Sequence, residues 1–241
     1  MHTGLKKQII ELAKATPTVE VCGLIYANDS GPGLFPCVNI AEDPTTNFEI
    51  AADDHLSCLK QGDVIACYHS HPNGPAVFSE SDLETAEEAC LPFYMYDVAS
   101  QSWVEHLPDS YRVSYQGRRF IWGFEDCYST CRHWYRQELG LNLGDYDRDK
   151  TFDTTDSSAI LDNFEKEGFV RFEVGQTEIR LHDGLLFDLK KRCPQHLAVF
   201  VSPQRMLHHP LNALSHIDLI DGRWVSHLKC ILRHKSLINS V

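Results

Sequence analysis

The sequence predicts two domains of mixed secondary structure, an α/β or α+β domain followed by an α+β domain. In the first half, segments with helical spacing of apolar residues alternate with apolar, β-branched runs typical of buried strands. In the second half, one long helix precedes several strands. A chain of 241 residues is long enough for two domains of ordinary size.

The elements of the first domain are predicted from periodicity and from turn residues. Helices are expected at residues 5–15, 52–59 and 81–89, and strands at 19–26, 34–40, 64–69 and 92–98. The Asn, Asp, Gly and Pro residues of segment 28–33 are expected to end the first strand. A polar stretch at 108–110 closes the domain, so we place the two domains at residues 1–108 and 112–241.

The elements of the second domain follow from the same signals. Helices are expected at 127–139 and 157–166, and strands at 184–189, 196–201, 205–208 and 224–232. The acidic segment 145–156 is expected to be a solvated loop. No repeat and no low-complexity segment interrupts this order.

The charge of the chain is divided unevenly between the two halves. Residues 1–110 carry 4 Lys and Arg against 17 Asp and Glu, whereas residues 111–241 carry 18 against 17. This step supports two separately composed units, and the acidic first half argues against nucleic acid as a partner, because phosphates would be repelled. An acidic solvated surface explains the same charge.

Cysteine usage and the N-terminus bear on the compartment. Nine cysteines include no CxxC pair, so neither a disulfide framework nor a Cys-only zinc site is indicated, and most are expected to be core residues in a reducing compartment. The N-terminus lacks the pattern of a signal peptide, and no apolar run reaches the roughly 20 residues of a transmembrane segment. We therefore expect a soluble protein that is not exported by the usual signal.

A candidate metal site lies in the segment from His69 to Asp82. Side chains at positions i and i+2 of a strand share one face, so His69 and His71 can point the same way. Ser79 is a plausible helix N-cap, and Asp82 lies in the first turn beyond it. Two imidazoles and one carboxylate leave an open position on Zn²⁺, as in catalytic sites, where the bound water becomes a nucleophile near neutral pH.

Such a site needs a base, and Glu20 is the candidate. It stands within the apolar strand expected at 19–26, where a carboxylate is costly to bury unless it is paired or functional. Taken alone, Glu20 could equally face solvent on an edge strand.

Together, Glu20, His69-x-His71-Pro72, Ser79 and Asp82 resemble the complete JAMM (MPN-plus) metallopeptidase signature. The resemblance implies an MPN α/β fold with His69, His71 and Asp82 as zinc ligands. It further implies Glu20 as general base and Ser79 as a hydrogen-bond donor to the tetrahedral intermediate. The alternative is that the HxHP turn is only a polar loop.

Among the cysteines, Cys127 is the candidate nucleophile. It opens the helix expected at 127–139, and a helix N-terminus lowers the pKa of a thiol. Cys131 lies one turn further along and is expected to be a core residue. A thiolate also needs an imidazole, and His196 and His208 can lie side by side on adjacent antiparallel strands. His196 is then the base and His208 the residue that orients it.

This arrangement resembles the papain-like NlpC/P60 family through Asp126-Cys127, the strand opened by His196, and His208 twelve residues later. For each histidine a structural role is the alternative. The family often places a tyrosine that assists the oxyanion where this chain has Phe120, so backbone N–H groups near Cys127 would have to serve. His209 is a rival for the orienting role.

The order of the two modules resembles a family of lambda-like phage tail-tip assembly proteins. That resemblance implies other phage tail-tip proteins as partners, a protein substrate for the metal domain and peptidoglycan stem peptides for the cysteine domain. Synthesis without a signal peptide predicts the host cytoplasm during assembly, and later delivery by the virion tail tip to the host periplasm is a hypothesis. The alternative is a structural tail-tip component without turnover. A ubiquitin-type isopeptidase would explain only the first half.

Overall fold

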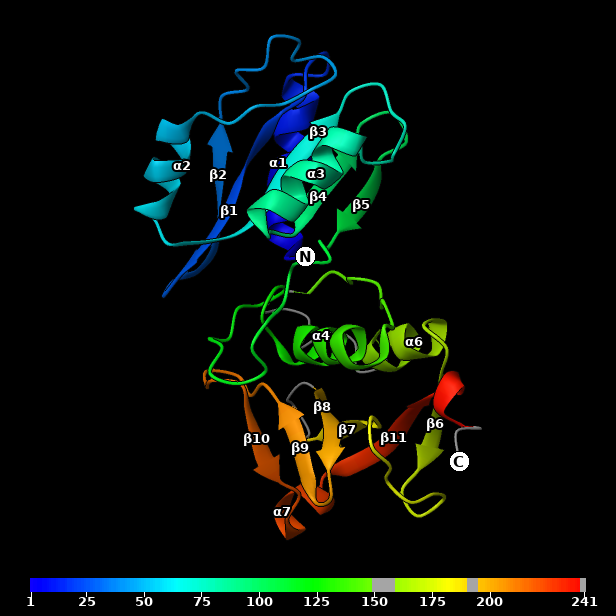
Figure 1. Ribbon diagram of the computed structural model, residues 1–241. Coiled ribbons are helices and arrows are strands. Elements are labelled where there is room, and N and C mark those ends of the chain that lie inside the picture. The colour runs from blue at the N-terminus through cyan, green and yellow to red at the C-terminus, as the bar shows by residue number, and fades with distance from the viewer. Residues whose placement is uncertain (149–158, 190–194, 239–241) are drawn as a thin grey trace. The chain divides into compact units, whose positions relative to one another are not determined.

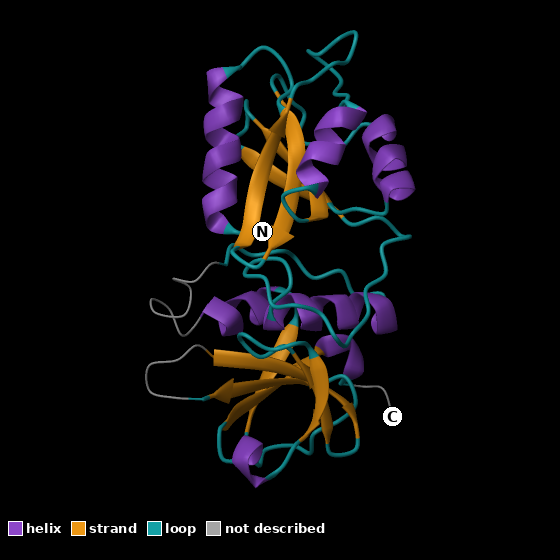
Figure 2. Cartoon of the chain, turned by 90° about the vertical axis from the view of Figure 1, so that its left-hand side faces the viewer, coloured by secondary structure: helices purple, strands orange, loops and turns teal. Residues whose placement is uncertain are grey.

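The computed structural model describes residues 1–148, 159–189 and 195–238, and the chain divides into two compact units: His2–Arg112, and Val113–Val241 together with Met1. Figures 1 and 2 show that each unit combines a sheet with helices. The expectation of an α/β domain followed by an α+β domain is confirmed. Within the described residues, no helix is both long and apolar enough to cross a bilayer.

The first unit is built on a five-stranded sheet of order β2-β1-β3-β4-β5. Only β3 and β4 pair in parallel, through the crossover helix α3. In Figure 2, α1 lies on one face of this sheet, while α2 and α3 lie on the other. The elements are α1 (Thr3–Ala15), β1 (Cys22–Asn28), β2 (Gly31–Cys37), α2 (Ala52–Leu59), β3 (Asp63–His71), α3 (Glu80–Ala89), β4 (Phe93–Asp97) and β5 (Ser102–His106).

The turn between β1 and β2 is shorter than predicted. Only two residues separate the strands, and Asn28 pairs with Gly31, so β2 begins three residues before the expected start. Gly31 has a φ of +114°, a conformation that favours glycine, and a Cβ on Gly33 would lie 2.3 Å from the ring of Tyr26. These glycines permit a tight hairpin and close packing, whereas the sequence suggested a loop. The edge strand β5 was not predicted, because its residues are all half-buried and show no clear alternation.

The second unit contains a six-stranded antiparallel sheet of order β10-β9-β8-β7-β11-β6. Within this unit, α4 and α6 lie along one side of the sheet in Figure 1, and the short helix α7 lies at the far end of β9 and β10. The elements are α4 (Cys127–Leu139), α6 (Ala159–Lys166), β6 (Phe169–Glu173), β7 (Gly184–Asp188), β8 (Gln195–Ser202), β9 (Arg205–His208), β10 (His216–Leu219), α7 (Gly222–Val225) and β11 (Leu228–His234).

Three strands of this sheet differ from the predictions. The last strand begins at Leu228, and Trp224 lies in α7, because Asp221 caps that turn by accepting from the backbone N–H groups of Arg223 and Trp224. The strands β6 and β10 were not predicted. Residues 157–158, the expected start of the second helix, lie outside the described part of the chain.

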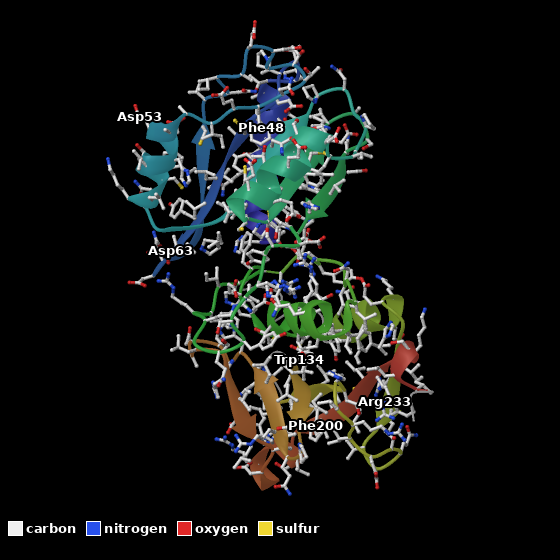
Figure 3. All side chains as sticks on the ribbon, viewed as in Figure 1. Phe48, Asp53, Asp63, Trp134, Phe200 and Arg233 are labelled. Atoms are coloured by element: carbon white, nitrogen blue, oxygen red, sulfur yellow. The ribbon has the colours of Figure 1, made fainter. Side chains whose placement is uncertain are left out.

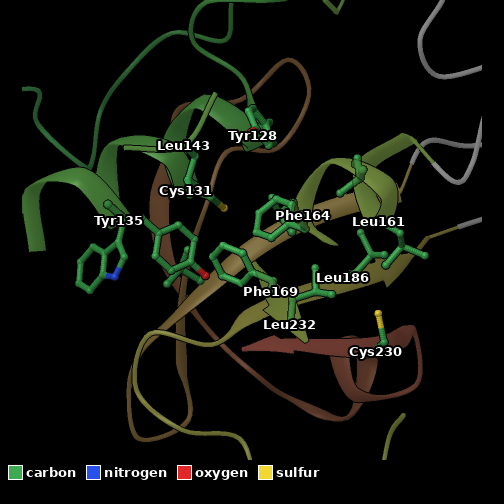
Figure 4. Packing of buried hydrophobic residues seen from close by; sticks show 14 of the residues in the cluster. Tyr128, Cys131, Tyr135, Leu143, Leu161, Phe164, Phe169, Leu186, Cys230 and Leu232 are labelled. Carbon is green, nitrogen blue, oxygen red and sulfur yellow. The ribbon is translucent and has the colours of Figure 1, made fainter. Parts of the chain in front are cut away.

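Two apolar clusters occupy the opposite faces of this sheet. The helix-side cluster joins Tyr128, Cys131 and Tyr135 of α4 to strand residues such as Leu186 and Leu232 (Figure 4). It also includes Leu197, Val199 and Leu207 of β8 and β9. The Trp224-side cluster consists of Leu185, Phe187, Ala198, Met206, Trp224 and Ile231. Because side chains alternate along a strand, consecutive residues of β8 and β9 belong to different clusters. This division determines what each histidine of the second unit can contact.

Candidate active sites

The candidate metal ligands of the first unit lie close together at the end of β3. His69 and His71 are two residues apart near the end of that strand, and their Nε2 atoms lie 3.2 Å apart. Asp82 Oδ2 lies 3.5 Å from His69 Nε2 and 3.7 Å from His71 Nε2. The three ligand atoms therefore form a nearly regular triangle.

Asp82 is held in place by the N-terminus of α3. Ser79 Oγ accepts from the Asp82 N–H at 3.1 Å, and Asp82 Oδ2 accepts from the Ser79 N–H at 2.8 Å, which together make a capping box. A serine hydroxyl has two lone pairs and one proton, so the cap does not use the Ser79 proton. Ser79 Oγ also lies 3.0 Å from Ser81 Oγ, and either hydroxyl can donate in that hydrogen bond. The same residue can orient Asp82 and serve as a donor.

Replacement of Ser79 by alanine tests the capping role. We expect Ser79→Ala to lower the free energy of unfolding by about 1 kcal/mol, because an N-cap contributes roughly that amount. Ser79→Asn should keep most of the stability, since asparagine also caps helices. Thermal unfolding followed by circular dichroism measures both variants, and equal losses in the two would contradict the capping role.

Glu20 lies beside the triangle, although not within a strand. The strand predicted at 19–26 begins at Cys22, and Glu20 occupies the preceding loop, where its N–H donates to Pro44 O at 2.7 Å and its C=O accepts from Asn39 Nδ2 at 3.0 Å. These backbone bonds to a neighbouring loop replace strand pairing. The side chain is buried, with Oε1 3.7 Å from His71 Nε2.

The electrostatics of the site suit a base beside metal ligands. Burial raises the pKa of Glu20 to about 7, so its carboxyl group can take up and return a proton near neutral pH. Burial lowers the pKa of His69, whose ring also stacks on Phe48 at 4.6 Å (Phe48 is labelled in Figure 3). For Asp82, hydrogen bonds to the two histidines outweigh burial and lower its pKa, so it remains a carboxylate.

The donor set fits zinc. Ligand atoms about 2.0–2.2 Å from a tetrahedral ion are separated by roughly 3.3–3.5 Å. The separations of 3.2, 3.5 and 3.7 Å bracket that value. Glu20, His69 and His71 also form a group whose ligand atoms lie within 4.8 Å of one another.

In the second unit, Cys127 is the first residue of α4 and packs against the helix-side cluster. Asp126 caps the helix: its carboxylate accepts from the Ser129 N–H and Oγ–H, both at 2.9 Å, and from the Gly123 N–H at 3.0 Å. The carboxylate that precedes the candidate nucleophile is thus a buried structural group that fixes the start of α4.

Arg148 completes this cap, and the sequence did not indicate it. Its Nε donates to Asp126 Oδ2 at 2.7 Å, its Nη1 to Asp145 Oδ1 at 3.0 Å, and its guanidinium lies 4.6 Å from the ring centre of Tyr128. The expectation that segment 145–156 is a solvated loop is wrong for Asp145 and Arg148, whose side chains are only 7% and 4% exposed; residues 149–156 lie outside the described part. Burial alone would raise the pKa of Asp126, but the positive charge of Arg148 outweighs that effect and lowers the pKa.

The two candidate histidines are brought together by β8 and β9. His196 Nε2 and His208 Nδ1 lie 2.9 Å apart. Both rings pack on Trp224, with ring centroids 5.8 Å away for His196 and 5.0 Å away for His208. Burial lowers the pKa of His196 to about 3 and that of His208 to about 4, so both rings are neutral at pH 7. By strand alternation they share the face of Ala198 and Met206, the Trp224-side cluster.

Cys127 and the histidine pair therefore pack against different clusters. His209 comes directly after His208, so its side chain points to the opposite face of the sheet. Its Nδ1 lies 3.4 Å from Thr130 Oγ1, and Thr130 is one helical turn from Cys127. Its ring packs edge-on against Phe120, with centroids 5.2 Å apart. Burial lowers the pKa of His209 to about 4. His209 is thus a third neutral imidazole, and unlike His196 and His208 it lies on the α4 side of the sheet.

The fold and these sites define a protein that joins two hydrolase modules, and comparisons with known families give the same division. Residues 2–110 match the family of prokaryotic homologs of the JAB domain, and residues 117–233 match the NlpC/P60 family. The chain therefore consists of a JAB domain followed by an NlpC/P60 domain.

Two relatives that align with most of the chain are phage tail tip assembly proteins. The tail tip assembly protein K of Escherichia phage N15 is 26% identical over 229 residues, covering 90% of this chain and 89% of that protein. Its namesake in Escherichia phage lambda is 27% identical over 190 residues, covering 78% and 90%. The desampylase of Haloferax volcanii is 32% identical over 99 residues, covering 37% of this chain and 68% of that protein.

Proposed function

We propose that this protein is a phage tail-tip assembly protein that carries two peptidase sites. The JAB-type site hydrolyses an amide or isopeptide bond of a protein with the help of zinc, and the NlpC/P60-type site hydrolyses a stem-peptide bond of peptidoglycan. The observation that carries the proposal is the triangle of His69, His71 and Asp82 with Glu20 beside it, because a purely structural protein needs no such set.

In the first site, His69, His71 and Asp82 would hold the ion. When bound, zinc would lower the pKa of a water ligand enough to supply a nucleophile near neutral pH. Glu20 takes up the proton released during attack and returns it to the leaving amine, which its pKa of about 7 permits. The cap does not use the Ser79 proton, so with Ser81 as the donor in their mutual hydrogen bond Ser79 would donate to a developing oxyanion.

In the second site, Cys127 attacks the carbonyl carbon of a stem-peptide bond as a thiolate. The amine leaves with a proton from the imidazole base, and water then hydrolyses the thioester and restores the thiol. His196 is the base, and His208, 2.9 Å away, orients it. The position of His209 beside Thr130 favours a second assignment, in which His209 serves Cys127 directly.

The first experiment is mass spectrometry of purified muropeptides incubated with the intact protein, Cys127→Ala and Glu20→Ala. Cleavage by the intact protein and by Glu20→Ala, but not by Cys127→Ala, is the expected result, with a loss in Cys127→Ala of about 10³-fold or more. Failure of the folded, zinc-loaded protein to cleave any stem peptide would instead favour an assembly factor that uses peptidase folds only for binding.

Histidine variants in the same assay decide between the two bases. His196→Ala and His208→Ala should both lose activity if the histidine pair serves Cys127, whereas His209→Ala should retain it. The reverse pattern would assign the base to His209. Circular dichroism of each variant separates a lost base from a lost fold.

The tail-tip role predicts when and where the protein is found. Other tail-tip proteins are its proposed partners, with assembly in the host cytoplasm and later delivery by the virion to the periplasm. Peptide mass spectrometry of purified virions and of tail-assembly intermediates tests this part. Absence of the protein from both preparations would contradict it.

A further inference from the structure

A second cluster of metal-ligating side chains lies on β9 and β10, in the second unit. His208, His216 and Asp218 each offer one ligand atom, and these atoms all lie within 4.8 Å of one another. His216 pairs directly with His208 across the two strands, and Asp218 is two residues further along β10, on the same face as His216. The pairing of the strands therefore brings the three side chains together.

The details of this cluster suit a transition metal. His208 Nε2 and His216 Nε2 point at each other across 3.1 Å, close to the separation of two nitrogen ligands on a tetrahedral ion, roughly 3.3 Å. Trp224 Nε1 donates to Asp218 Oδ2 at 3.1 Å, the kind of outer hydrogen bond that orients a ligating carboxylate. His216 and Asp218 are only half-buried, so an ion can enter from solvent.

The surrounding hydrogen bonds determine what an ion would do. Leu214 O can only accept, so His216 Nδ1, 2.8 Å away, carries a proton, and in the neutral ring His216 Nε2 offers a lone pair. Without metal, His208 Nε2–H then donates to His216, and His208 Nδ1 accepts from His196 Nε2–H. His196 Nδ1 is consequently unprotonated and available as a base.

A metal ion on His208 Nε2 reverses the direction of the hydrogen bond between His208 and His196. The ion displaces the Nε2 proton, so the neutral His208 ring carries its proton on Nδ1 and donates it to His196 Nε2. His196 then holds its own proton on Nδ1 and can no longer accept one there. The direction of one hydrogen bond thus decides whether His196 is a base.

We propose that His208, His216 and Asp218 form a second zinc site that switches off the imidazole base of the cysteine peptidase. Zinc binding itself is independent of any catalytic role, whereas the inhibition rests on the proposed function of His196. A high-zinc environment would keep the cysteine site inactive, and a zinc-poor one would release it.

Metal content of the full-length protein tests the site itself. After dialysis against zinc and gel filtration, we expect two zinc ions per chain by mass spectrometry of the metal, and one per chain in His69→Ala/His71→Ala. In that background, His216→Gln should lose the remaining ion, with an affinity weaker by at least about 100-fold. His227→Gln, a control at a half-buried histidine of the same unit that lies outside the cluster, should keep it.

Cobalt gives an independent readout, because tetrahedral Co²⁺ absorbs strongly in the visible range. The His69→Ala/His71→Ala protein should show this absorption, and the further change Asp218→Asn should weaken it while leaving the circular dichroism spectrum unchanged. A stoichiometry of one zinc in the intact protein, or no effect of His216→Gln on a second ion, would overturn the proposal.

The inhibition is measured with muropeptides. Zinc added to the metal-free protein should reduce stem-peptide cleavage at least 10-fold, and His216→Gln should cleave equally well with and without zinc. Inhibition that persists in His216→Gln would overturn the switch. Absence of cleavage under all conditions would reject the peptidase function, while the zinc stoichiometry would still decide the metal site.

Discussion

Arg148→Ala is expected to lower the free energy of unfolding of the second unit by about 3–5 kcal/mol, the usual cost of removing one partner of a buried ion pair. The guanidinium contacts Asp126 at 2.7 Å and Asp145 at 3.0 Å, and all three side chains are buried. Removal of Arg148 leaves Asp126 without its cation and weakens the cap of α4, whereas Asp145 keeps its ion pair with the N-terminal ammonium group of Met1. Chemical denaturation followed by tryptophan fluorescence measures this loss, because Trp122, Trp134 and Trp224 belong to this unit.

An exposed ion pair of the same unit provides the matched control. Arg171 and Glu173 also form a salt bridge, but both side chains are exposed, and Arg171→Ala should cost less than about 1 kcal/mol. The double change Asp126→Asn/Arg148→Met should cost less than the sum of the two single changes, because no uncompensated charge remains at that pair. Equal effects of Arg148→Ala and Arg171→Ala would contradict the role of the buried pair.

Acid is expected to destabilise the second unit well above the pH at which carboxylates titrate. His196, His208 and His209 are buried, and their pKa values in the folded protein are about 3, 4 and 4, against roughly 6.5 in the unfolded chain. A lowered pKa contributes stability that is present above pH 6.5 and is lost as pH falls toward the folded value. Between pH 7.5 and 5.5 the three groups together should cost about 4 kcal/mol.

Denaturation midpoints measured at several pH values in the presence of EDTA test this expectation, since a bound ion would otherwise mask the histidines. His209→Asn should reduce the pH dependence by roughly one third, because one of three buried histidines is removed. A free energy of unfolding that stays constant between pH 7.5 and 5.5 would show that the rings are protonated in the folded protein or solvated there.

The first site could be predicted almost completely from local sequence. His69 and His71 need only the two-residue repeat of a strand to share a face, and Ser79 and Asp82 need only the first turn of a helix. Glu20 is distant in the chain, and its segment was assigned to β1 by its apolar neighbours. Its backbone bonds to Pro44 and Asn39, which no local pattern reveals, hold it in a loop instead.

The second site could be predicted only in part from local sequence. The hairpin of β8 and β9 makes His196 and His208 neighbours, and this follows from strand pairing alone. Strand alternation also predicts that His209 points to the other face, but not which face α4 covers. Arg148 had no visible signal, because a single arginine in an acidic stretch resembles a solvated residue until Asp126 is known to be buried.

By itself, the sequence determined the two-part organisation, most helices and strands, and the candidate ligand triangle, because each depends on periodicity or on residues close together in the chain. The tertiary structure alone decided which histidine faces α4, the burial of Arg148 against Asp126, and the convergence of His208, His216 and Asp218. These features depend on which sheet face a helix covers and on strands that pair across a turn. The free energy that selects them comes from packing of the whole unit, and no short segment encodes it.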